Sequence, residues 1–273
     1  MQDERAFGVL MAARWLGLVW HYARHADRGF WHSPAFGGLL ALLFLAASVP
    51  LSGSRSCTAL LVVLLGGAFV RWAVATARDR RRRRRSPAGP LLAGALGVLA
   101  AGGLVYGLAR PVIAQRVAKT FEQAAVLEAR GDFGTRQVLY RDTWHMARDR
   151  VAFGWGMGSY PVVFTFYNTQ PAGADRLPHF YFDAHSDWLQ GVAELGLAGT
   201  GLVGLLGLLP LLSLHGFRRS GPLPRSLGAG CALVLLYAWV EFPFGSPAVV
   251  LAWWLCFFAA VRQGQLEAHA AGD

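Results

Sequence analysis

The stretch GGLLALLFLAASVPLSGSRSCTALLVVLLGGAFV, residues 37–70, decides the fold. It contains two long apolar runs that are separated only by a short turn of serine, glycine and arginine. A helix needs about 17–25 mostly apolar residues to cross a bilayer. Extended to their natural limits, 35–51 and 57–77, both runs are long enough. The stretch therefore predicts two membrane-spanning helices joined by a tight turn.

The rest of the 273-residue chain repeats this pattern, and 54% of its residues are hydrophobic. Six apolar runs have a usable length, namely 35–51, 57–77, 88–109, 188–214, 226–242 and 247–261. We therefore predict an all-α polytopic membrane protein with about six transmembrane helices. The earlier run from Phe7 to Trp20 is interrupted by Arg14 and predicts an interfacial helix or a truncated span. The cysteines Cys57, Cys231 and Cys256 show no CxxC spacing, so neither a disulfide framework nor a zinc site is indicated.

Positive charge fixes the expected orientation. The net charge is +10, and much of the excess lies in Arg78 and the run Arg80–Arg85, between the second and third spans. Such a block favours the cytoplasmic side and contact with membrane lipids. Nucleic-acid binding is disfavoured because no aromatic residues are interleaved with the arginines. Both termini are then expected in the cytoplasm.

This orientation divides the chain into five parts. We expect a cytoplasmic or interfacial segment 1–34, three spans in 35–109 with a basic loop 78–86, an external (periplasmic) loop subdomain 110–187, three spans in 188–262, and a cytoplasmic tail 263–273. Within the external subdomain, helices are expected over about 111–129 and 135–150. The turn GWGMGSYP at 154–161 lacks the preceding strand and the lysine of a phosphate loop, so it predicts no nucleotide site. The aromatic segment 162–181 suits the membrane interface.

Several polar residues lie at the side predicted to be external, next to or within an apolar run, and their position requires an explanation. In DAHSDWLQGVAELGLAG, 183–199, His185 precedes the fourth span, and Glu194 is expected ~13 Å deeper. A carboxylate at that depth costs about 2.5–3.5 kcal/mol unless it faces protein or water. Gln190 lies one helical turn before it. The alternative to a functional role is that Glu194 is a buried structural acid bonded to another span and that His185 is an ordinary interfacial residue. The cluster His179, Asp183, His185 and Asp187 matches no known zinc spacing, so no metal is expected.

Two arginines share this side. Arg55, in the turn SGSRS, runs against the positive-inside trend, and lipid contact is its alternative explanation. Arg136 follows GDFG at the start of the second loop helix, where a solvated surface charge is the alternative.

Three motifs resemble one family. RQVLYRDTWHMA at 136–147, GWGMGSY at 154–160 and especially AHSDWLQGVAELGLAG at 184–199 are similar to the C-terminal signature of the O-antigen ligase/polymerase superfamily, which includes protein O-oligosaccharyltransferases. The SGSRS turn resembles the family's Ser-Arg turn. The resemblance covers about residues 36–262. Ser186 stands where the family more often has Asn. Members usually have ten or more spans, so the chain is expected to correspond to their C-terminal portion.

The resemblance implies a metal-independent glycosyltransferase without a cofactor, in the bacterial cytoplasmic membrane. Its donor would be an undecaprenyl-diphosphate-linked glycan, and its acceptor a hydroxyl on a growing glycan, on lipid A core or on a protein. It implies catalytic roles for His185 as base and for Arg55 and Arg136 as a diphosphate clamp. Substrate-binding or supporting roles would fall to Glu194, Gln190, Asp187 and Arg141. The segment between Gly154 and Tyr181 would select the acceptor.

Two other classes fit the composition. A transporter or flippase for lipid-linked glycans would also place charges near a cavity. An inactive, truncated membrane scaffold is the third possibility.

Overall fold

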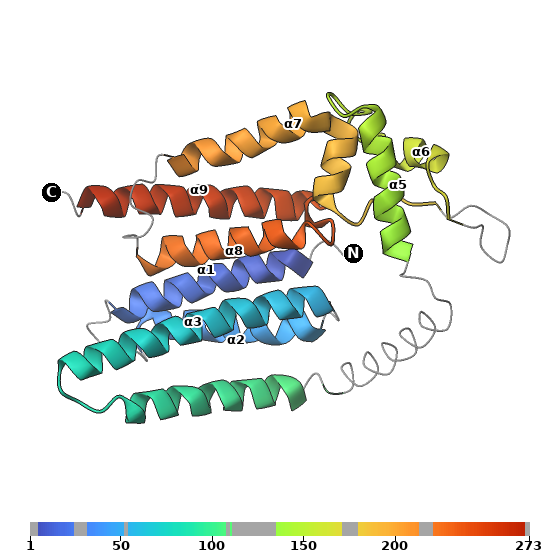
Figure 1. The fold of residues 1–273 in the computed structure, drawn as a ribbon. Helices are drawn as coiled ribbons and strands as arrows, with labels where there is room; N and C mark the ends of the chain where they lie inside the picture. The colour runs from blue at the N-terminus through green and yellow to red at the C-terminus, as the bar shows by residue number, and fades with distance from the viewer. Residues whose placement is uncertain are drawn as a thin grey trace.

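The structure is a computed structural model that describes residues 5–24, 32–51, 54–107, 110, 135–170, 180–212 and 221–270. All regular elements among these residues are helical (Figure 1). The helices are α1 (Arg5–Arg24), α2 (Pro34–Leu51), α3 (Arg55–Arg82), the helix Ala88–Gly107, α5 (Thr135–Asp149), α6 (Tyr160–Val163), α7 (Asp187–Leu212), α8 (Pro222–Tyr237) and α9 (Pro247–Ala270), with short 3-10 turns η2 (Phe164–Phe166) and η3 (Pro243–Gly245).

Five of these helices are long and apolar enough to cross a membrane. They are α2, Ser56–Arg82 of α3, Ala88–Gly107, Asp187–Gly207 of α7, and α9. Large apolar side chains on them, such as Phe44, Val62, Leu99 and Leu255, are exposed on the outside of the protein. Hydrocarbon accepts such a surface, and the helices satisfy their own backbone groups. The chain is therefore an all-helical polytopic membrane protein, as the sequence predicted. The expected span 226–242 corresponds to the shorter α8, which is not among these five.

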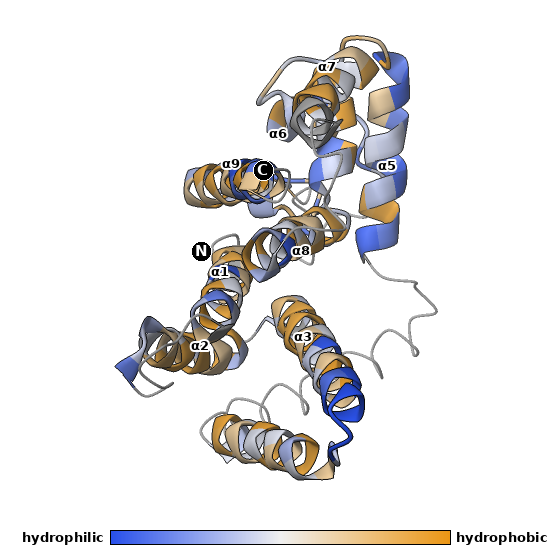
Figure 2. Cartoon of the chain, turned by 90° about the vertical axis from the view of Figure 1, so that its left-hand side faces the viewer, coloured by the Kyte–Doolittle hydropathy of each residue, from blue (hydrophilic) through white to orange (hydrophobic). Residues whose placement is uncertain are grey.

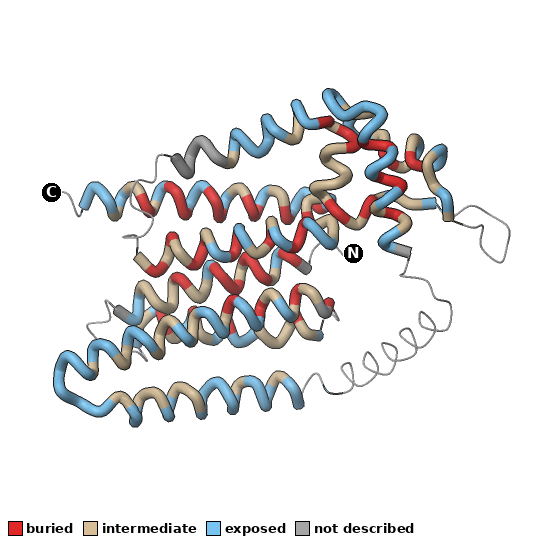
Figure 3. The backbone as a smooth tube through the Cα atoms, in the orientation of Figure 1, coloured by how far each residue is buried: buried red, intermediate tan, exposed pale blue. Residues whose placement is uncertain are grey.

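The centre of the bundle is formed by α1, which packs most extensively against α8 and α2. Small residues allow the close approach: a Cβ on Gly230 of α8 would lie 2.5 Å from Cβ of Ala13. Figure 3 shows buried backbone along α1, α8 and α9. The run Phe7–Trp20 was expected as an interfacial helix or a truncated span. It belongs to a 20-residue helix inside the bundle, with Val9 and Leu10 fully buried.

The two ends of the bundle differ in charge. In Figure 2 the hydrophilic end of α3 lies away from α5, and it carries the arginine run Arg80–Arg85. The N-terminal end of α1 lies at the α5 end, whereas the C-terminal end of α9 lies at the opposite end (Figure 1). The cytoplasmic placement of the C-terminus stays a prediction. The expected cytoplasmic placement of the N-terminus is at odds with the packing of α1 along α2 and α8, which puts its N-terminal end at the α5 end.

The loop subdomain has a small core of its own. Helix α5, expected over 135–150, is present as Thr135–Asp149 and packs against the first part of α7. Leu139, Met146, Tyr160 and Phe164 are buried between them, and the rings of Tyr160 and Phe164 stack at 4.9 Å. The helix expected over 111–129 lies outside the described residues.

Helix α7 is broken at Gly196, whose backbone is non-helical with φ 67° and ψ −175°. The break leaves backbone groups without helical partners, and the loop 151–156 supplies them. Leu197 N–H donates to the carbonyl of Val151 at 2.8 Å, and Gly156 N–H donates to the carbonyl of Glu194 at 2.8 Å. The first part of α7 is thereby bonded into the loop subdomain, and the remaining part continues along the bundle (Figure 1).

Candidate active site

Three ionisable side chains meet at the α5 end of the bundle. Arg136 comes from the first turn of α5, His185 from the segment just before α7, and Glu241 from the short connection between α8 and α9. These segments are far apart in sequence, and Arg136 and Glu241 are separated by 105 positions. The structure therefore brings together two of the three residues predicted as catalytic, and it adds a carboxylate.

Glu241 is the centre of this cluster. Its Oε1 accepts a hydrogen bond from Nη2 of Arg136 at 2.5 Å, and its Oε2 lies 3.6 Å from Nδ1 of His185. Nη1 of Arg136 also donates to the carbonyl of Val240 at 3.2 Å. The Arg136 side chain nevertheless remains 52% exposed, whereas that of Glu241 is only 17% exposed. An anionic ligand could therefore reach the guanidinium without unfolding the site.

His185 is held in an unusual backbone conformation. Its φ of 52° lies in the left-handed region, which is uncommon for residues other than glycine and marks strain. Tyr140 Oη donates to the His185 carbonyl at 2.8 Å, and the ring of Phe242 contacts the imidazole edgewise at 5.1 Å. Nδ1 is buried and has no hydrogen-bond partner among the described residues. The imidazole is thus fixed beside a carboxylate while its side chain stays partly exposed.

Ser186 explains why α7 starts at this point. Its Oγ accepts from Leu189 N–H at 3.4 Å, and its carbonyl accepts from Gln190 N–H at 3.0 Å, which makes it the N-cap. Serine and asparagine are both strong N-cap residues. The serine that stands at this position therefore keeps the helix start, and with it the position of His185.

The electrostatics favour an ionised Glu241. Burial alone would raise the pKa of this carboxyl, but its interactions with His185 and Arg136 outweigh burial and hold the pKa below its usual value of 4.5. Burial raises the pKa of Tyr140, an effect opposed by Arg136 and reinforced by Glu241. The Tyr140 hydroxyl therefore remains protonated and continues to donate to the His185 carbonyl.

The lowered pKa of Glu241 predicts a specific pH dependence. A carboxyl with a depressed pKa stabilises the folded state fully above its unfolded pKa, and this stabilisation is lost as the pH falls through the folded pKa. We expect the melting-temperature difference between wild type and Glu241→Gln to be constant from about pH 7 to about pH 5 and to shrink below about pH 4.5. Thermal unfolding in detergent across this range measures it. A difference that grows on acidification would contradict the assignment.

Glu194 lies in a different environment from the one expected. The sequence placed it ~13 Å into the fourth span, but the break at Gly196 keeps it on the loop-subdomain side. Its carboxylate accepts from the backbone N–H of Gly158 at 3.0 Å, of Tyr160 at 3.1 Å, and from Nε2 of Gln190 at 3.3 Å. The turn GWGMGSYP thus wraps a carboxylate, and its glycines 154, 156 and 158 all have positive φ.

Replacing Glu194 with glutamine should destabilise the subdomain. The amide would present a donor to backbone donors, and an unsatisfied buried group costs about 1–3 kcal/mol. Thermal unfolding of the purified variant measures the loss. Asp79→Asn is a matched control because Asp79 is 58% exposed and pairs only with Arg83 of the next helical turn, so its replacement should change stability little. Equal melting of the Glu194 variant and wild type would contradict this role.

Gln190 and Asp187 connect the start of α7 to its surroundings. Oε1 of Gln190 accepts from Ala184 N–H at 3.1 Å, which ties the segment carrying His185 back onto the helix. Oδ2 of Asp187 accepts from Phe244 N–H at 2.9 Å, and the backbone N–H of Asp187 donates to the carbonyl of Ala238 at 2.9 Å. Both residues therefore position the segments that carry His185 and Glu241.

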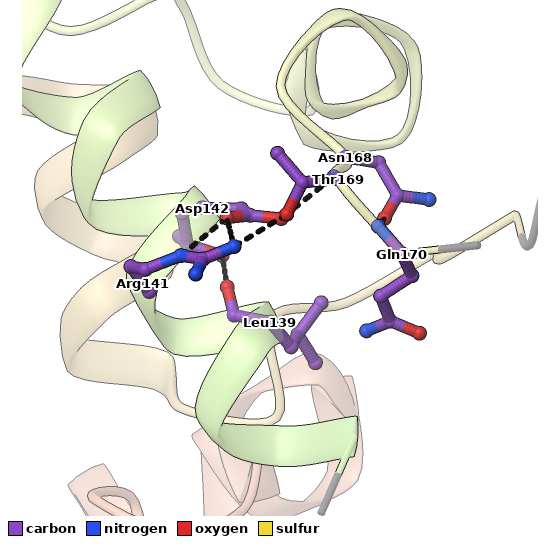
Figure 4. A network of polar contacts seen from close by, with 7 residues as sticks. Leu139, Arg141, Asp142, Asn168, Thr169 and Gln170 are labelled. Atoms are coloured by element: carbon purple, nitrogen blue, oxygen red, sulfur yellow. Dashed lines mark hydrogen bonds and ion pairs between the residues drawn. The ribbon is translucent and has the colours of Figure 1, made fainter. Parts of the chain in front are cut away.

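Arg141 belongs to a separate polar network (Figure 4). Its Nε donates to Oδ1 of the buried Asp142 at 3.0 Å, and its Nη2 donates to Thr169. Oδ2 of Asp142 accepts from both N–H and Oγ1 of Thr169 at 2.8 Å. These bonds hold the segment that follows η2 against α5. In the structure the Arg141 guanidinium thus bonds to Asp142 and to Thr169 of the aromatic segment 162–181.

Arg55 is the first residue of α3, and its side chain lies outside what the structure describes. The helix is capped by Ser54, whose Oγ accepts from Cys57 N–H at 3.2 Å. The phenol of Tyr237 interacts with Ser54 and Cys57, and it also interacts electrostatically with Glu241. The start of α3 therefore lies at the same end of the bundle as the cluster.

Sequence reasoning missed Glu241 and Tyr140. Glu241 carries a usable signal, because it is an acid in a short loop directly after an apolar run, on the side predicted to be external. Tyr140 follows Arg136 by four residues and so shares its helix face. Among the described residues, no group of three His, Cys, Asp or Glu side chains is placed to hold a metal ion, and His179 lies outside them.

Comparison with known proteins yields one family. A family model described as O-antigen ligase matches residues 40–209, which is more than half of the chain. The match includes all the predicted site residues but not Glu241. Neither the curated proteins nor the solved structures contain a match.

Proposed function

Because the chain belongs to the O-antigen ligase family, and is thus a membrane protein of the ligase/polymerase type, we propose that it transfers a glycan from undecaprenyl diphosphate to an acceptor hydroxyl at the α5 end of the bundle. The observation that carries this proposal is the joining of Arg136 and His185 through Glu241. The α5 end is external because the arginine run Arg80–Arg85 lies at the other end.

His185 is the proposed general base. The acceptor hydroxyl oxygen forms a bond to the anomeric carbon, and the bond from that carbon to the diphosphate oxygen breaks. The hydroxyl proton passes to the imidazole, and the diphosphate leaves with the bonding electrons. An imidazole titrates near the working pH and suits this role. Glu241, 3.6 Å from Nδ1, would stabilise the imidazolium and leave Nε2 to face the acceptor.

Arg136 and Arg55 are the proposed diphosphate clamp. Guanidinium groups offer forked donors that match phosphate oxygens, and such donors stabilise the charge that develops on a leaving group. Nη2 of Arg136 donates to the carboxylate of Glu241, which supports the binding of an anion by this guanidinium. On donor binding, the diphosphate would share the Arg136 guanidinium with this carboxylate or displace the carboxylate from it. The reaction requires no metal ion or cofactor in this proposal.

A growing polysaccharide, lipid A core and a protein hydroxyl all present the same nucleophile. In the described part of the segment between Gly154 and Tyr181, α6 and η2 contact α7 and α5, and Met157 and Phe166 are exposed. We assign acceptor choice to this segment. A mass-spectrometric survey of the glycans lost on deletion of the gene identifies the acceptor.

Complementation tests the three catalytic assignments. A strain deficient in the ligase or polymerase is supplied with wild type, His185→Ala, Arg55→Ala or Arg136→Ala, and membrane levels of each protein are compared. We expect loss of glycan product from all three variants at normal protein levels. Normal product from all three would remove the catalytic assignment. Loss of product with the His185 variant alone would keep the base and discard the clamp.

Glu241→Gln should reduce transfer less than removal of the base. One charge-assisted hydrogen bond contributes about 1.5–3 kcal/mol, which corresponds to roughly 10- to 100-fold in rate. The amide retains the size of the side chain but cannot pair with a cationic Arg136 or His185. A transfer assay on membranes with matched protein levels measures the effect. Wild-type rates would mean that Glu241 only holds the loop together.

A further inference from the structure

A second candidate site lies at the opposite end of the bundle. Helices α1, α3 and α8 line a half-open cavity of about 410 Å³. This volume falls within the range of about 300–1,000 Å³ that is usual for small-ligand sites. Two arginines, Arg71 and Arg225, line it together with Trp20. None of these residues belongs to the cluster around Glu241.

The cavity is cationic at one end and apolar at the other. Arg225 lies in the first turn of α8, and Arg71 lies in the half of α3 that leads to the arginine run. Val63 precedes Arg71 by eight residues and Leu233 follows Arg225 by eight. Because a helix rises 1.5 Å per residue, both apolar residues lie ~12 Å nearer the middle of the bundle. The walls between them are formed by small and aliphatic side chains.

This polarity matches an amphiphile held in one leaflet. Guanidinium groups bind phosphate oxygens through forked hydrogen bonds. Cz of Arg71 lies 4.3 Å from the centroid of the Trp20 ring, a cation–π contact that fixes the guanidinium at the cavity rim. The arginine run of the same end attracts anionic headgroups to this surface. A zwitterionic lipid would bring a cation toward two arginines.

We propose that this cavity binds an anionic phospholipid from the leaflet at the basic end of the bundle, the cytoplasmic leaflet by the positive-inside rule. The phosphate lies between Arg71 and Arg225, and an acyl chain extends past Gly67 toward Val63 and Leu233. The bound lipid contacts α1, α3 and α8 at the same time and so bridges the three helices. The site is independent of the proposed glycan transfer.

Gly67 allows the lipid site to be tested without changing its charge. A Cβ at Gly67 meets nothing within 4 Å, so leucine fits the fold and fills the path of the acyl chain. Gly66 is the matched control, because its Cβ also meets nothing within 4 Å and it does not line the cavity. Both substitutions replace glycine in a helix with a better helix former.

The experiment is native mass spectrometry of the purified full chain titrated with phosphatidylglycerol, phosphatidylcholine or inorganic phosphate. We expect phosphatidylglycerol to bind at least about tenfold more tightly than phosphatidylcholine, and Gly67→Leu and the double variant Arg71→Gln/Arg225→Gln each to lose about tenfold. Gly66→Leu should bind as wild type does. Equal binding of both lipids, or unchanged binding to Gly67→Leu, would overturn the proposal. Full displacement by equimolar inorganic phosphate would overturn it in favour of a free-anion site.

Discussion

His185→Ala should lower the rate of glycan transfer by about 10²- to 10⁴-fold, the usual contribution of a positioned general base. The imidazole is the only proton acceptor assigned to the acceptor hydroxyl, and its backbone is held by Tyr140 and by the N-cap Ser186. The loss should appear in kcat, because proton removal belongs to the chemical step. A membrane-based transfer assay with a defined lipid-linked donor measures it.

Two further variants separate catalysis from folding. His185→Asn keeps a residue that tolerates the left-handed backbone, yet it cannot act as a base, so it should be as inactive as the alanine variant and melt near wild type. His145→Gln is the matched control, because His145 is exposed on α5 and lies nine residues, or ~13 Å along the helix, from Arg136. Near-normal transfer by His185→Asn would contradict the assignment of His185 as the general base.

Gly196→Ala should destabilise the protein by about 3 kcal/mol or more. The backbone of Gly196 lies at φ 67° and ψ −175°, a region that is almost restricted to glycine and costs other residues about 1–3 kcal/mol. A Cβ there would also lie 2.4 Å from the carbonyl oxygen of Ala152 and 2.5 Å from Phe153 N. Because both neighbours are backbone atoms, the loop 151–156 would have to move away and release its bonds to α7.

Thermal unfolding in detergent and limited proteolysis of the loop subdomain measure this effect. Gly201→Ala is the matched control, since Gly201 lies five residues further along the same helix and its Cβ would meet nothing within 4 Å. It should be neutral or slightly stabilising, because alanine is a better helix former than glycine. If Gly196→Ala melted at the temperature of Gly201→Ala, the break in α7 would not be a required feature of the fold.

The sequence predicted the membrane class well because hydrocarbon imposes a simple rule. A run such as 35–51 must be helical if it crosses the bilayer, since every backbone group needs an internal partner. The helix from Thr135 followed from local signals, a plausible N-cap and a glycine-rich stop after Arg150. These features depend on neighbours in sequence and can be found without knowledge of tertiary contacts.

The break at Gly196 could not be predicted in the same way. The run after Asp187 satisfies every length and composition rule for one continuous span. The break depends on four backbone bonds to the loop 151–156, whose partners are 38 or 46 positions apart in the chain. Glu194 was therefore placed in the span, although its partners Gly158 and Tyr160 belong to the loop subdomain.

The candidate site was predicted in part. Arg136 and His185 were singled out by resemblance, and the structure places them around one carboxylate. That carboxylate, Glu241, was missed because its partners are 105 and 56 positions away, and nothing local in EFPFG marks it as paired. The convergence of the Arg55 side chain on this cluster stays a prediction.

The central claim, that this end of the bundle transfers a glycan from a lipid diphosphate, is tested most directly by adding purified donor to the protein in liposomes. We expect consumption of undecaprenyl-diphosphate-linked glycan, release of undecaprenyl diphosphate and a new glycosidic bond on the acceptor. Movement of intact donor between leaflets without product would indicate a flippase, and an unchanged donor would indicate a scaffold. Either of these results would contradict the proposed function.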